Sequence, residues 1–295
     1  MFFNMFKINI LLSKLLKNTG YKLIRVENEQ FSFKEFGNSS HILQNGLYFY
    51  KSLLKKHKSL KVENYKKGLL FIINNVKHYV TSSEEIYILN EIYTDDCYML
   101  IGKEKNYNVI DIGMNVGFSA LFFSQLSSVK KVYGFEPVTK TYFQALENFS
   151  LNPEFAQNIK PFNFGIGNED RKEQFVYNDN FKGSVGLVEV NFKNQNDKNN
   201  EIVEVFIKDV NNVILEILSQ HPLEKFILKI DCEGAEFEII ESLSLNRNLN
   251  KFEIIILEWH INKPDTLISW LLDANFVIHR NLKKETLGLL YAFKN

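Results

Sequence analysis

Short apolar runs alternate with helix-like patterns over the C-terminal two thirds of the chain. Residues 107–113 and 225–234 each begin with an apolar run and end in an acid-containing turn, and the segments that follow, 118–128 and 236–243, have helical character. Runs that are apolar throughout are typical of strands covered on both faces, and parallel neighbours need crossover helices. The alternation therefore predicts an α/β fold with a doubly wound, mostly parallel sheet and helices on both faces.

Residues 1–100 lack this alternation and are predicted to form an N-terminal extension, with the main domain at 101–295. Residues 1–18 have apolar positions at helical spacing, interrupting lysines, and no apolar run long enough for a membrane span or a signal segment. We expect an amphipathic helix there, which either makes peripheral contact with a membrane surface or packs on the domain. The basic stretch 51–67 is interpreted as a solvated helix face.

Two further elements are predicted within this extension. Residues 68–80 are typical of a β-hairpin with Asn74 and Asn75 at its turn. Residues 82–93 are typical of a helix, because Ser82 or Ser83 can cap its first turn and two glutamates follow.

Composition narrows the class of protein. The 295 residues carry 35 Lys and Arg against 35 Asp and Glu, so the basic excess usual in nucleic-acid-binding proteins is missing and a nucleic-acid partner is disfavoured. Cys97 and Cys232 lie far apart without CxxC spacing, which disfavours a disulfide framework and indicates a reducing, cytoplasmic compartment. Cys232 stands between two acids that should raise the pKa of its thiol, so we expect a buried structural thiol.

Acidic residues gather where the predicted strands end. In doubly wound sheets, ligands bind beyond the carboxyl ends of the strands, where the strand order reverses. Four of the five strand ends considered carry an acid, and these ends are 111–113, 136–137, 165–167, 231–234 and 258–260. The candidate site is therefore expected at this edge of the sheet.

The stretch DIGMNVG at 111–117 can be compared with known cofactor-binding motifs by the spacing of its glycines. Asn115 stands where a dinucleotide-binding fingerprint needs glycine, and the two glycines are one residue too close for a Walker A loop. Glu136, at the end of the second strand, can accept hydrogen bonds from both ribose hydroxyls of an adenosine. Asp111 in the first turn suits a cationic partner better than a pyrophosphate. S-adenosylmethionine, with a ribose, a sulfonium and an ammonium group, meets both demands.

With these motifs in this order, the sequence resembles FkbM-type, class I S-adenosylmethionine-dependent methyltransferases. The resemblance covers roughly residues 68–260 and is carried by the segments 109–124, 132–137, 145–152, 164–175 and 227–243, with 84–98 similar to the segment that leads into the domain. Met114 replaces the small residue usual at its position, which we interpret as tolerated because the site needs only a backbone contact there. The resemblance implies a seven-stranded, Rossmann-like methyltransferase sheet.

The resemblance also implies which residues bind the cofactor. The glycines of the first turn would let the backbone approach the methionine part, whose ammonium and carboxylate groups the acid and the asparagine of that turn would orient. Glu136 would hold the ribose, and residues after the second and third strands would flank the adenine. The expected cofactor-binding residues are Asp111, Gly113, Met114, Asn115, Gly117, Glu136, Pro137, Phe164 and Gly165.

Asp231, Glu233 and His260 are the candidate catalytic residues. The two acids share the turn after the strand expected beside the first strand, and His260 ends the next strand along. An aliphatic hydroxyl is a weak nucleophile that needs a general base, for which His260 is the candidate. In the alternative interpretations, Glu233 complements a helix dipole and His260 is a surface residue, and no further ligands are spaced to complete a metal site. Lys229, on the same strand as Asp231, is expected to pair with a carboxylate, for which Glu258 is the natural partner.

The resemblance implies an O-methyltransferase acting on a hydroxyl of a sugar, glycan or secondary metabolite. RNA ribose methylation is an alternative that would need a basic groove, which only residues 51–67 offer. A nicotinamide-dependent oxidoreductase is disfavoured by Asn115, and a cofactor-binding protein without catalysis is a third alternative. The loop 178–187 is either a lid over the acceptor or an ordinary loop.

Overall fold

The computed structural model describes residues 33–98, 106–184, 186–187 and 198–295. Residues 36–295 form one compact unit. The helix predicted over residues 1–18 lies outside the described residues, and the domain boundary predicted near residue 100 stays a prediction. Within the described part of the chain, no helix combines the length and the apolar character needed to cross a membrane.

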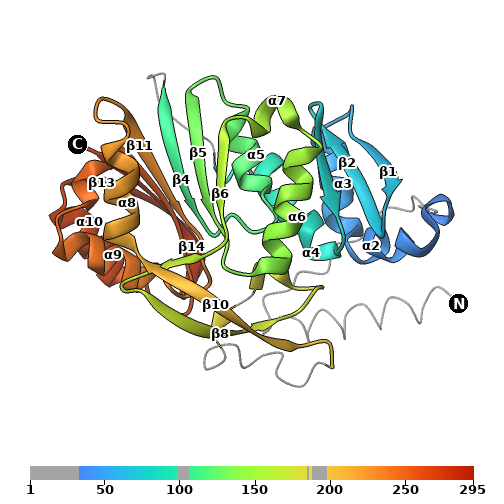
Figure 1. The fold of residues 1–295 in the computed structure, drawn as a ribbon. Helices are drawn as coiled ribbons and strands as arrows, with labels where there is room; N and C mark the ends of the chain where they lie inside the picture. The colour runs from blue at the N-terminus through green and yellow to red at the C-terminus, as the bar shows by residue number, and fades with distance from the viewer. Residues whose placement is uncertain (1–32, 99–105, 185, 188–197) are drawn as a thin grey trace, which may run out of the picture. The chain divides into compact units, whose positions relative to one another are not determined.

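A seven-stranded sheet forms the centre of this unit (Figure 1). Its order is β13-β14-β12-β11-β4-β5-β6, and of these strands β14 alone runs opposite to the other six. The strands are β4 (Tyr107–Ile112), β5 (Val129–Phe135), β6 (Ile159–Phe162), β11 (Lys225–Ile230), β12 (Ile254–Trp259), β13 (Phe276–Lys284) and β14 (Leu287–Lys294). The predicted doubly wound, mostly parallel, seven-stranded sheet is confirmed.

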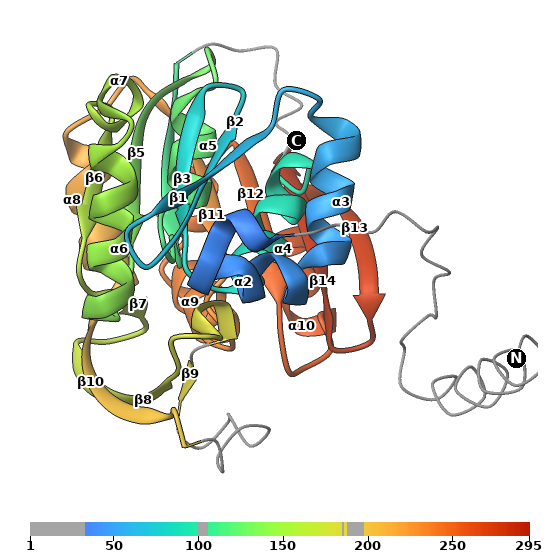
Figure 2. The same ribbon diagram turned by 90° about the vertical axis from the view of Figure 1, so that its right-hand side faces the viewer.

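Helices cover both faces of this sheet (Figures 1 and 2). On one face lie α8 (Val210–Ser219), α9 (Glu236–Leu245) and α10 (Asp265–Asp273), and on the other lie α5 (Phe118–Ser124), α6 (Thr139–Ser150) and α7 (Pro153–Ala156). Ile110 and Ile112 join the core beneath the first group. Because successive strand residues point to opposite faces, Asp111 between them points toward α5, where Ser119 hydrogen-bonds it. Asp111 is therefore buried between β4 and the helix α5.

The segment before the sheet contains short helices and a three-stranded antiparallel sheet. Its elements are η1 (Lys34–Ser39), α2 (Ser40–Asn45), α3 (Leu47–Lys56), β1 (Lys61–Tyr65), β2 (Gly68–Ile73), β3 (Val76–Val80) and α4 (Ser83–Tyr93). The predicted hairpin is confirmed, since β2 and β3 pair antiparallel and both Asn74 and Asn75 adopt positive φ. The predicted cap is also confirmed, because the Ser82 side chain accepts a hydrogen bond from the backbone N–H of Glu85.

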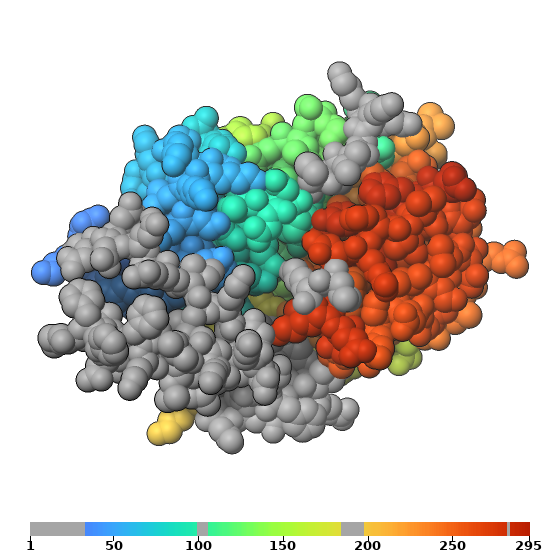
Figure 3. Space-filling model, turned by 180° about the vertical axis from the view of Figure 1, so that it is seen from behind, coloured from blue at the N-terminus to red at the C-terminus, as the bar shows by residue number. Residues whose placement is uncertain are grey.

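The solvated helix face predicted for 51–67 is wrong in its second half. The helix α3 ends at Lys56, and Lys61–Tyr65 form β1, which pairs with β2 along its whole length. β2 is almost fully buried, and its backbone N–H and C=O groups pair with those of β1. The lysines of this segment do not indicate that a strand partner is available, because that depends on the tertiary structure. Seen from behind, the teal surface around α4 lies between the blue surface of the preceding segment and the red surface of the C-terminal segment (Figure 3).

A second, four-stranded sheet extends beyond the ends of the central strands (Figure 2). Its order is β7-β10-β8-β9, with β7 (Gly165–Gly167), β8 (Arg171–Tyr177), β9 (Gly186–Leu187) and β10 (Glu201–Asp209). The remaining elements of the described residues are the short helices η2 (Lys182–Ser184) and η4 (Leu249–Lys251).

The prediction that the third strand of the central sheet ends at 165–167 is wrong, because β6 ends at Phe162 and β7 belongs to the second sheet. At the break, the side-chain amide of Asn163 donates to the backbone oxygens of Glu136 and Pro137, at 2.9 and 3.2 Å. These bonds hold the chain against the end of β5 and turn it out of the central sheet.

Candidate active site

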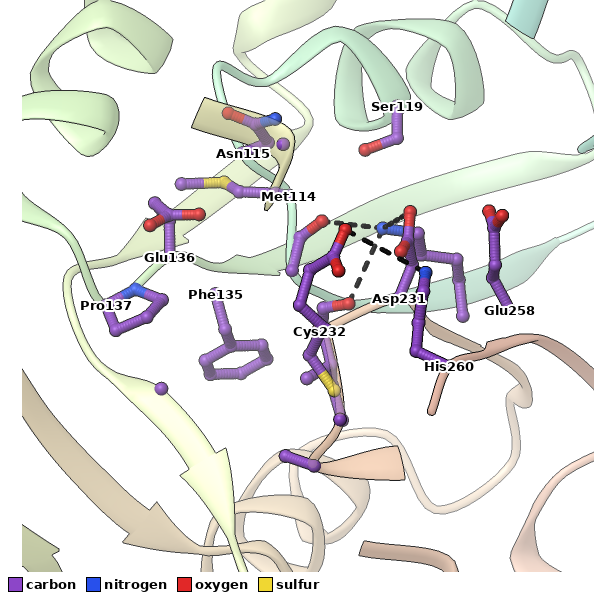
Figure 4. A pocket seen from close by; sticks show the side chains of 18 of the residues that line it. Met114, Asn115, Ser119, Phe135, Glu136, Pro137, Asp231, Cys232, Glu258 and His260 are labelled. Atoms are coloured by element: carbon purple, nitrogen blue, oxygen red, sulfur yellow. Dashed lines mark hydrogen bonds and ion pairs between the residues drawn. The ribbon is translucent and has the colours of Figure 1, made fainter. Parts of the chain in front are cut away.

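A cavity of about 1030 Å³ opens at the carboxyl ends of the central strands. It is lined by the turns after β4, β5 and β11, by the end of β12, by β7 of the second sheet and by one face of α4. This is the edge at which the sequence places the site, and it brings most of the predicted residues together (Figure 4). The cavity-lining members of that set are Gly113, Met114, Asn115, Glu136, Pro137, Gly165, Asp231, Glu233 and His260.

The turn after β4 needs glycine at its first position. Gly113 has φ +79°, and a Cβ there would lie 1.8 Å from the backbone oxygen of Asp231. The backbone N–H groups of Gly113 and Met114 both donate to the oxygen of Phe135, so the turn is tied to the end of β5. Gly117 does not line the cavity; it begins α5 with φ +83° and packs on Phe149.

Beneath this turn lies a buried ion pair. Lys229 Nζ is 3.0 Å from Asp111 Oδ1 and 2.6 Å from the oxygen of Gly113, while Ser119 Oγ donates to Asp111 Oδ2 at 2.6 Å. The partner predicted for Lys229, Glu258, is therefore wrong: Asp111 on the neighbouring strand is closest, and Asp231 Oδ2 follows at 3.8 Å. Burial lowers the pKa of Lys229, but the two aspartates outweigh it and the net pKa is raised.

Asp111 does not line the cavity, since its side chain is fully buried under the floor. It can act on a ligand through Lys229 and Ser119, its two side-chain partners, which both line the cavity. Asp111 and Lys229 are both named by the sequence motifs, but strand pairing between residues 118 positions apart decides that they meet.

Glu136 presents a buried carboxylate to the cavity from the end of β5. It is 7% exposed, and its Oε1 accepts a hydrogen bond from the backbone N–H of Val138 at 2.8 Å. Burial raises the pKa of this carboxyl group to about 7, against the lowering effect of the backbone N–H groups of Val138 and Asn115.

Of the residues predicted to flank the adenine, two line the cavity and one packs against the core instead. Pro137 and Gly165 line the cavity side by side, and a Cβ on Gly165 would lie 3.3 Å from Pro137 Cβ. Phe164 lies outside the cavity lining; its ring packs on Phe135, and Lys208 Nζ lies 4.4 Å from its centroid.

The acids of the turn after β11 and His260 from the end of β12 meet on the opposite wall (Figure 4). His260 Nε2 is 3.8 Å from Glu233 Oε1, and Tyr98 donates a hydrogen bond to Asp231 Oδ2 at 3.3 Å. Glu233 has a left-handed backbone, with φ +54°. Sites that hold a non-glycine residue in this region are often functional, because the surrounding structure must enforce it.

Burial shifts the pKa values on this wall. It raises the pKa of Glu233 to about 8, although the charge of His260 works in the other direction. Burial lowers the pKa of His260, but the hydrogen bond to Glu236 and the charge of Glu233 outweigh it, and the pKa rises to about 10. Burial, followed by the neighbouring acids, raises the pKa of the Cys232 thiol well above its usual value, so the predicted direction is confirmed. The predicted full burial is wrong, because Cys232 is half-buried and lines the cavity.

Sequence reasoning missed two residues. Glu236 is fully buried and bonds His260; its only sequence signal is its place in the first helical turn after the DCEG motif. Lys182, in the loop predicted as a lid or an ordinary loop, lines the cavity and is 8% exposed. Its Nζ lies 2.8 Å from Glu85 Oε1 and 2.6 Å from Gln144 Oε1, so this part of the loop is pinned to α4 and α6.

Comparison with known proteins gives one family and several relatives. A family model described as "Methyltransferase FkbM domain" matches residues 111–278. The methyltransferase sdnD of Sordaria araneosa is 26% identical over 56% of this chain and 71% of its own. Methyltransferase 1 of Beauveria bassiana is 24% identical over 61% of this chain and 75% of its own. The crystal structure of methyltransferase FkbM from Methylobacillus flagellatus KT is 14% identical, covers 96% of this chain and 70% of its own, and has a TM-score of 0.46.

Proposed function

This chain belongs to the FkbM methyltransferase family, and from that premise we propose that it transfers a methyl group from S-adenosylmethionine to a hydroxyl group of a sugar, glycan or secondary metabolite. The family match supports the methyltransferase activity, and the two curated relatives described above are both named methyltransferases, without an acceptor. The cofactor and the acceptor class are inferred from the residues of the cavity.

The observation that carries the cofactor assignment is the pair formed by Asn115 and Glu136. The buried Oδ1 of Asn115 has no hydrogen-bond partner among the described residues, and it can accept from the ammonium group of the methionine part. Glu136 is buried and cavity-facing, as a carboxylate that accepts from two ribose hydroxyls must be. Pro137 and Ile166 add an apolar wall for the adenine. When bound, S-adenosylmethionine supplies an electrophilic methyl group on a sulfonium.

The charge of the cavity favours an acceptor without negative charge. Its described lining carries nine carboxyl groups, of which Glu136 and Glu233 have raised pKa values, against four lysines and arginines and His260. Carboxylates accept hydrogen bonds from hydroxyl groups and repel phosphates, so this wall suits a polyol or a sugar better than RNA. The acids are Glu84, Glu91, Glu136, Glu173, Asp231, Glu233, Glu238, Glu241 and Glu258.

Removal of the hydroxyl proton is assigned to Glu233. A general base works best when its pKa lies near the working pH, and Glu233 combines a pKa of about 8 with a place on the cavity wall. His260, with its pKa of about 10, carries a proton at neutral pH and cannot take another. The proposed base is therefore Glu233 rather than His260, which serves as the cationic partner of the Glu233 carboxylate before that carboxylate takes the hydroxyl proton.

The test begins with binding, because no acceptor is needed. Calorimetry should detect S-adenosylhomocysteine binding and little NAD binding to the wild-type protein. Glu136→Gln should weaken S-adenosylhomocysteine binding about 10- to 100-fold, since charge-assisted hydrogen bonds contribute about 1.5–3 kcal/mol. Glu154→Gln is the matched control, because Glu154 is exposed on α7 away from the cavity.

Mass spectrometry then screens methyl transfer onto sugars, glycans, metabolites and an RNA. Methylated RNA, with none of the other compounds modified, would contradict the proposed acceptor class. Binding of NAD in preference to S-adenosylhomocysteine would contradict the cofactor assignment.

A further inference from the structure

Glu236 is a fully buried carboxylate at the first position of α9, next to the proposed active site. A charged group at such depth is retained only when several donors satisfy it. Glu236 has three: His260 Nδ1 at 2.7 Å from Oε1, the backbone N–H of Gly234 at 2.9 Å from Oε2, and the backbone N–H of Cys232 at 3.3 Å from Oε1. All three belong to segments that also line the cavity.

We infer that Glu236 is a positioning residue for the proposed methyl transfer, because its one carboxylate orients His260 and clamps the turn that presents Glu233 to the cavity. The inference rests on the proposed function for its catalytic meaning, whereas the geometric claim can be tested without an acceptor.

The contact with His260 fixes the orientation of the ring. An ionised carboxylate only accepts hydrogen bonds, so Nδ1 carries a proton and points to Glu236. Nε2 is then left on the side of Glu233, 3.8 Å from Oε1. A ring flip would remove the proton donor from the fully buried carboxylate, which makes the flipped orientation costly.

The contacts with the backbone hold an unusual turn. Glu233 and Gly234 both have positive φ, at +54° and +121°. The N–H groups of Cys232 and Gly234, on either side of Glu233, both donate to the carboxylate of Glu236. The position of Glu236 in the first turn of a helix also favours its negative charge. The base and its cationic partner are thereby set by the same buried group.

Other charges face the same ring and must be considered. Asp231 and Glu233 approach from the turn after β11, and the hydrogen bond to Glu236 is the strongest of the effects that favour the imidazolium. The remaining charged groups on this part of the cavity lining are Lys229, Glu258 and Lys284. Lys229 is engaged with Asp111 under the floor, so the carboxylates dominate around His260.

The experiment compares Glu236→Gln with a matched variant, Glu238→Gln. Both residues are acids in the first turn of α9, but Glu238 Oε1 pairs with Arg171 Nη2 at 2.7 Å instead of with His260. The full chain is labelled with ¹⁵N-histidine and titrated by NMR, and the His260 signal is identified by its loss in His260→Asn.

In the wild type and in Glu238→Gln, His260 should stay protonated until the pH approaches about 10. In Glu236→Gln, its pKa should fall by about 1 to 2, the equivalent of one charge-assisted hydrogen bond. An unchanged His260 titration in Glu236→Gln would overturn the inference. If Glu236→Gln does not fold, the NMR spectrum of the wild-type protein tests the contact instead. The inference requires a strongly downfield Nδ1 proton signal that disappears in His260→Asn, and the absence of this signal would overturn it.

Kinetics separate positioning from mere structural support. Glu236→Gln should lower kcat at least about 10-fold, the contribution of a positioned base, while the Kd for S-adenosylhomocysteine changes less than about threefold. A large change in that Kd with kcat unaltered would overturn the inference. If the wild-type protein binds the cofactor but methylates nothing while His260 responds as expected, the proposed function fails and the placement of His260 by Glu236 stands.

Discussion

Lys229→Met tests the buried ion pair beneath the cofactor turn. Lys229 is 2% exposed in its side chain and Asp111 is 0% exposed, with 3.0 Å between Nζ and Oδ1. Methionine keeps most of the length and apolar character of the lysine side chain but removes the cation, so Asp111 is left as a buried charge without its partner. Breaking a buried pair from one side costs about 3–5 kcal/mol. The oxygen of Gly113 also loses its donor, so the cofactor turn should loosen.

The magnitude is measured by urea unfolding, followed by circular dichroism. Lys172→Met is the matched control, because Lys172 Nζ lies 2.9 Å from Glu204 Oε1 but both side chains are more than half exposed. Such surface pairs contribute about 0–1 kcal/mol. The difference between the two variants isolates the effect of burial at nearly the same distance.

A double-mutant cycle completes this test. Adding Asp111→Asn to Lys229→Met removes the uncompensated charge and should recover part of the lost stability, giving a coupling energy of about 1–3 kcal/mol. The reasoning is refuted if Lys229→Met costs no more than Lys172→Met, or if Asp111→Asn makes the double variant less stable still. Asp111→Asn alone should leave S-adenosylhomocysteine binding within about tenfold of wild type, since Asp111 does not line the cavity.

Three further predictions follow from the same geometry. Gly113→Ala should abolish cofactor binding by calorimetry because its Cβ would meet the oxygen of Asp231, whereas Gly37→Ala, also at positive φ but with nothing within 4 Å, should bind normally and lose only about 1–2 kcal/mol. Methyl transfer should rise with pH through about 8 as Glu233 loses its proton; a profile that is flat between pH 6 and 9 would contradict its role as base. Burial lowers the pKa of His78 to about 3, and its ring nitrogens have no hydrogen-bond partner among the described residues. Below pH 6.5, His78 binds a proton in the unfolded chain but stays neutral in the folded chain. The free energy of unfolding should therefore fall by about 2–3 kcal/mol between pH 6.5 and 4.5. In His78→Phe, which fills the space between Tyr93 and Phe118, this contribution should vanish from acid unfolding curves; an unchanged acid sensitivity would count against it.

Features that depend on residues close together in the chain were predictable from the sequence. The hairpin turn at Asn74 and Asn75, the serine cap of α4 and the apolar strands of the central sheet all follow from local propensity and periodicity. The same holds for the place of the cavity, because the carboxyl ends of parallel strands meet at one edge. Most predicted site residues line that cavity for this reason, although their chemical roles remain proposals.

Features that depend on which strands lie side by side were decided by the tertiary structure. Lys229 meets Asp111 because β11 pairs with β4, whereas the sequence had indicated Glu258 as its partner. β1 forms because β2 supplies a partner, and the chain leaves the central sheet after Phe162 because Asn163 bonds the end of β5.

The same distinction applies to the chemistry of the turn DIGMNVG and the wall opposite it. The spacing of the turn argued against a dinucleotide and a Walker A loop, and the acids Asp111 and Glu136 indicated S-adenosylmethionine. Burial, which no local pattern reports, raises the pKa of Glu233. The hydrogen bond to Glu236, a contact across 24 residues, keeps His260 protonated. The sequence therefore determined which groups stand at the strand ends, and only the packing around them decided which of those groups can take a proton.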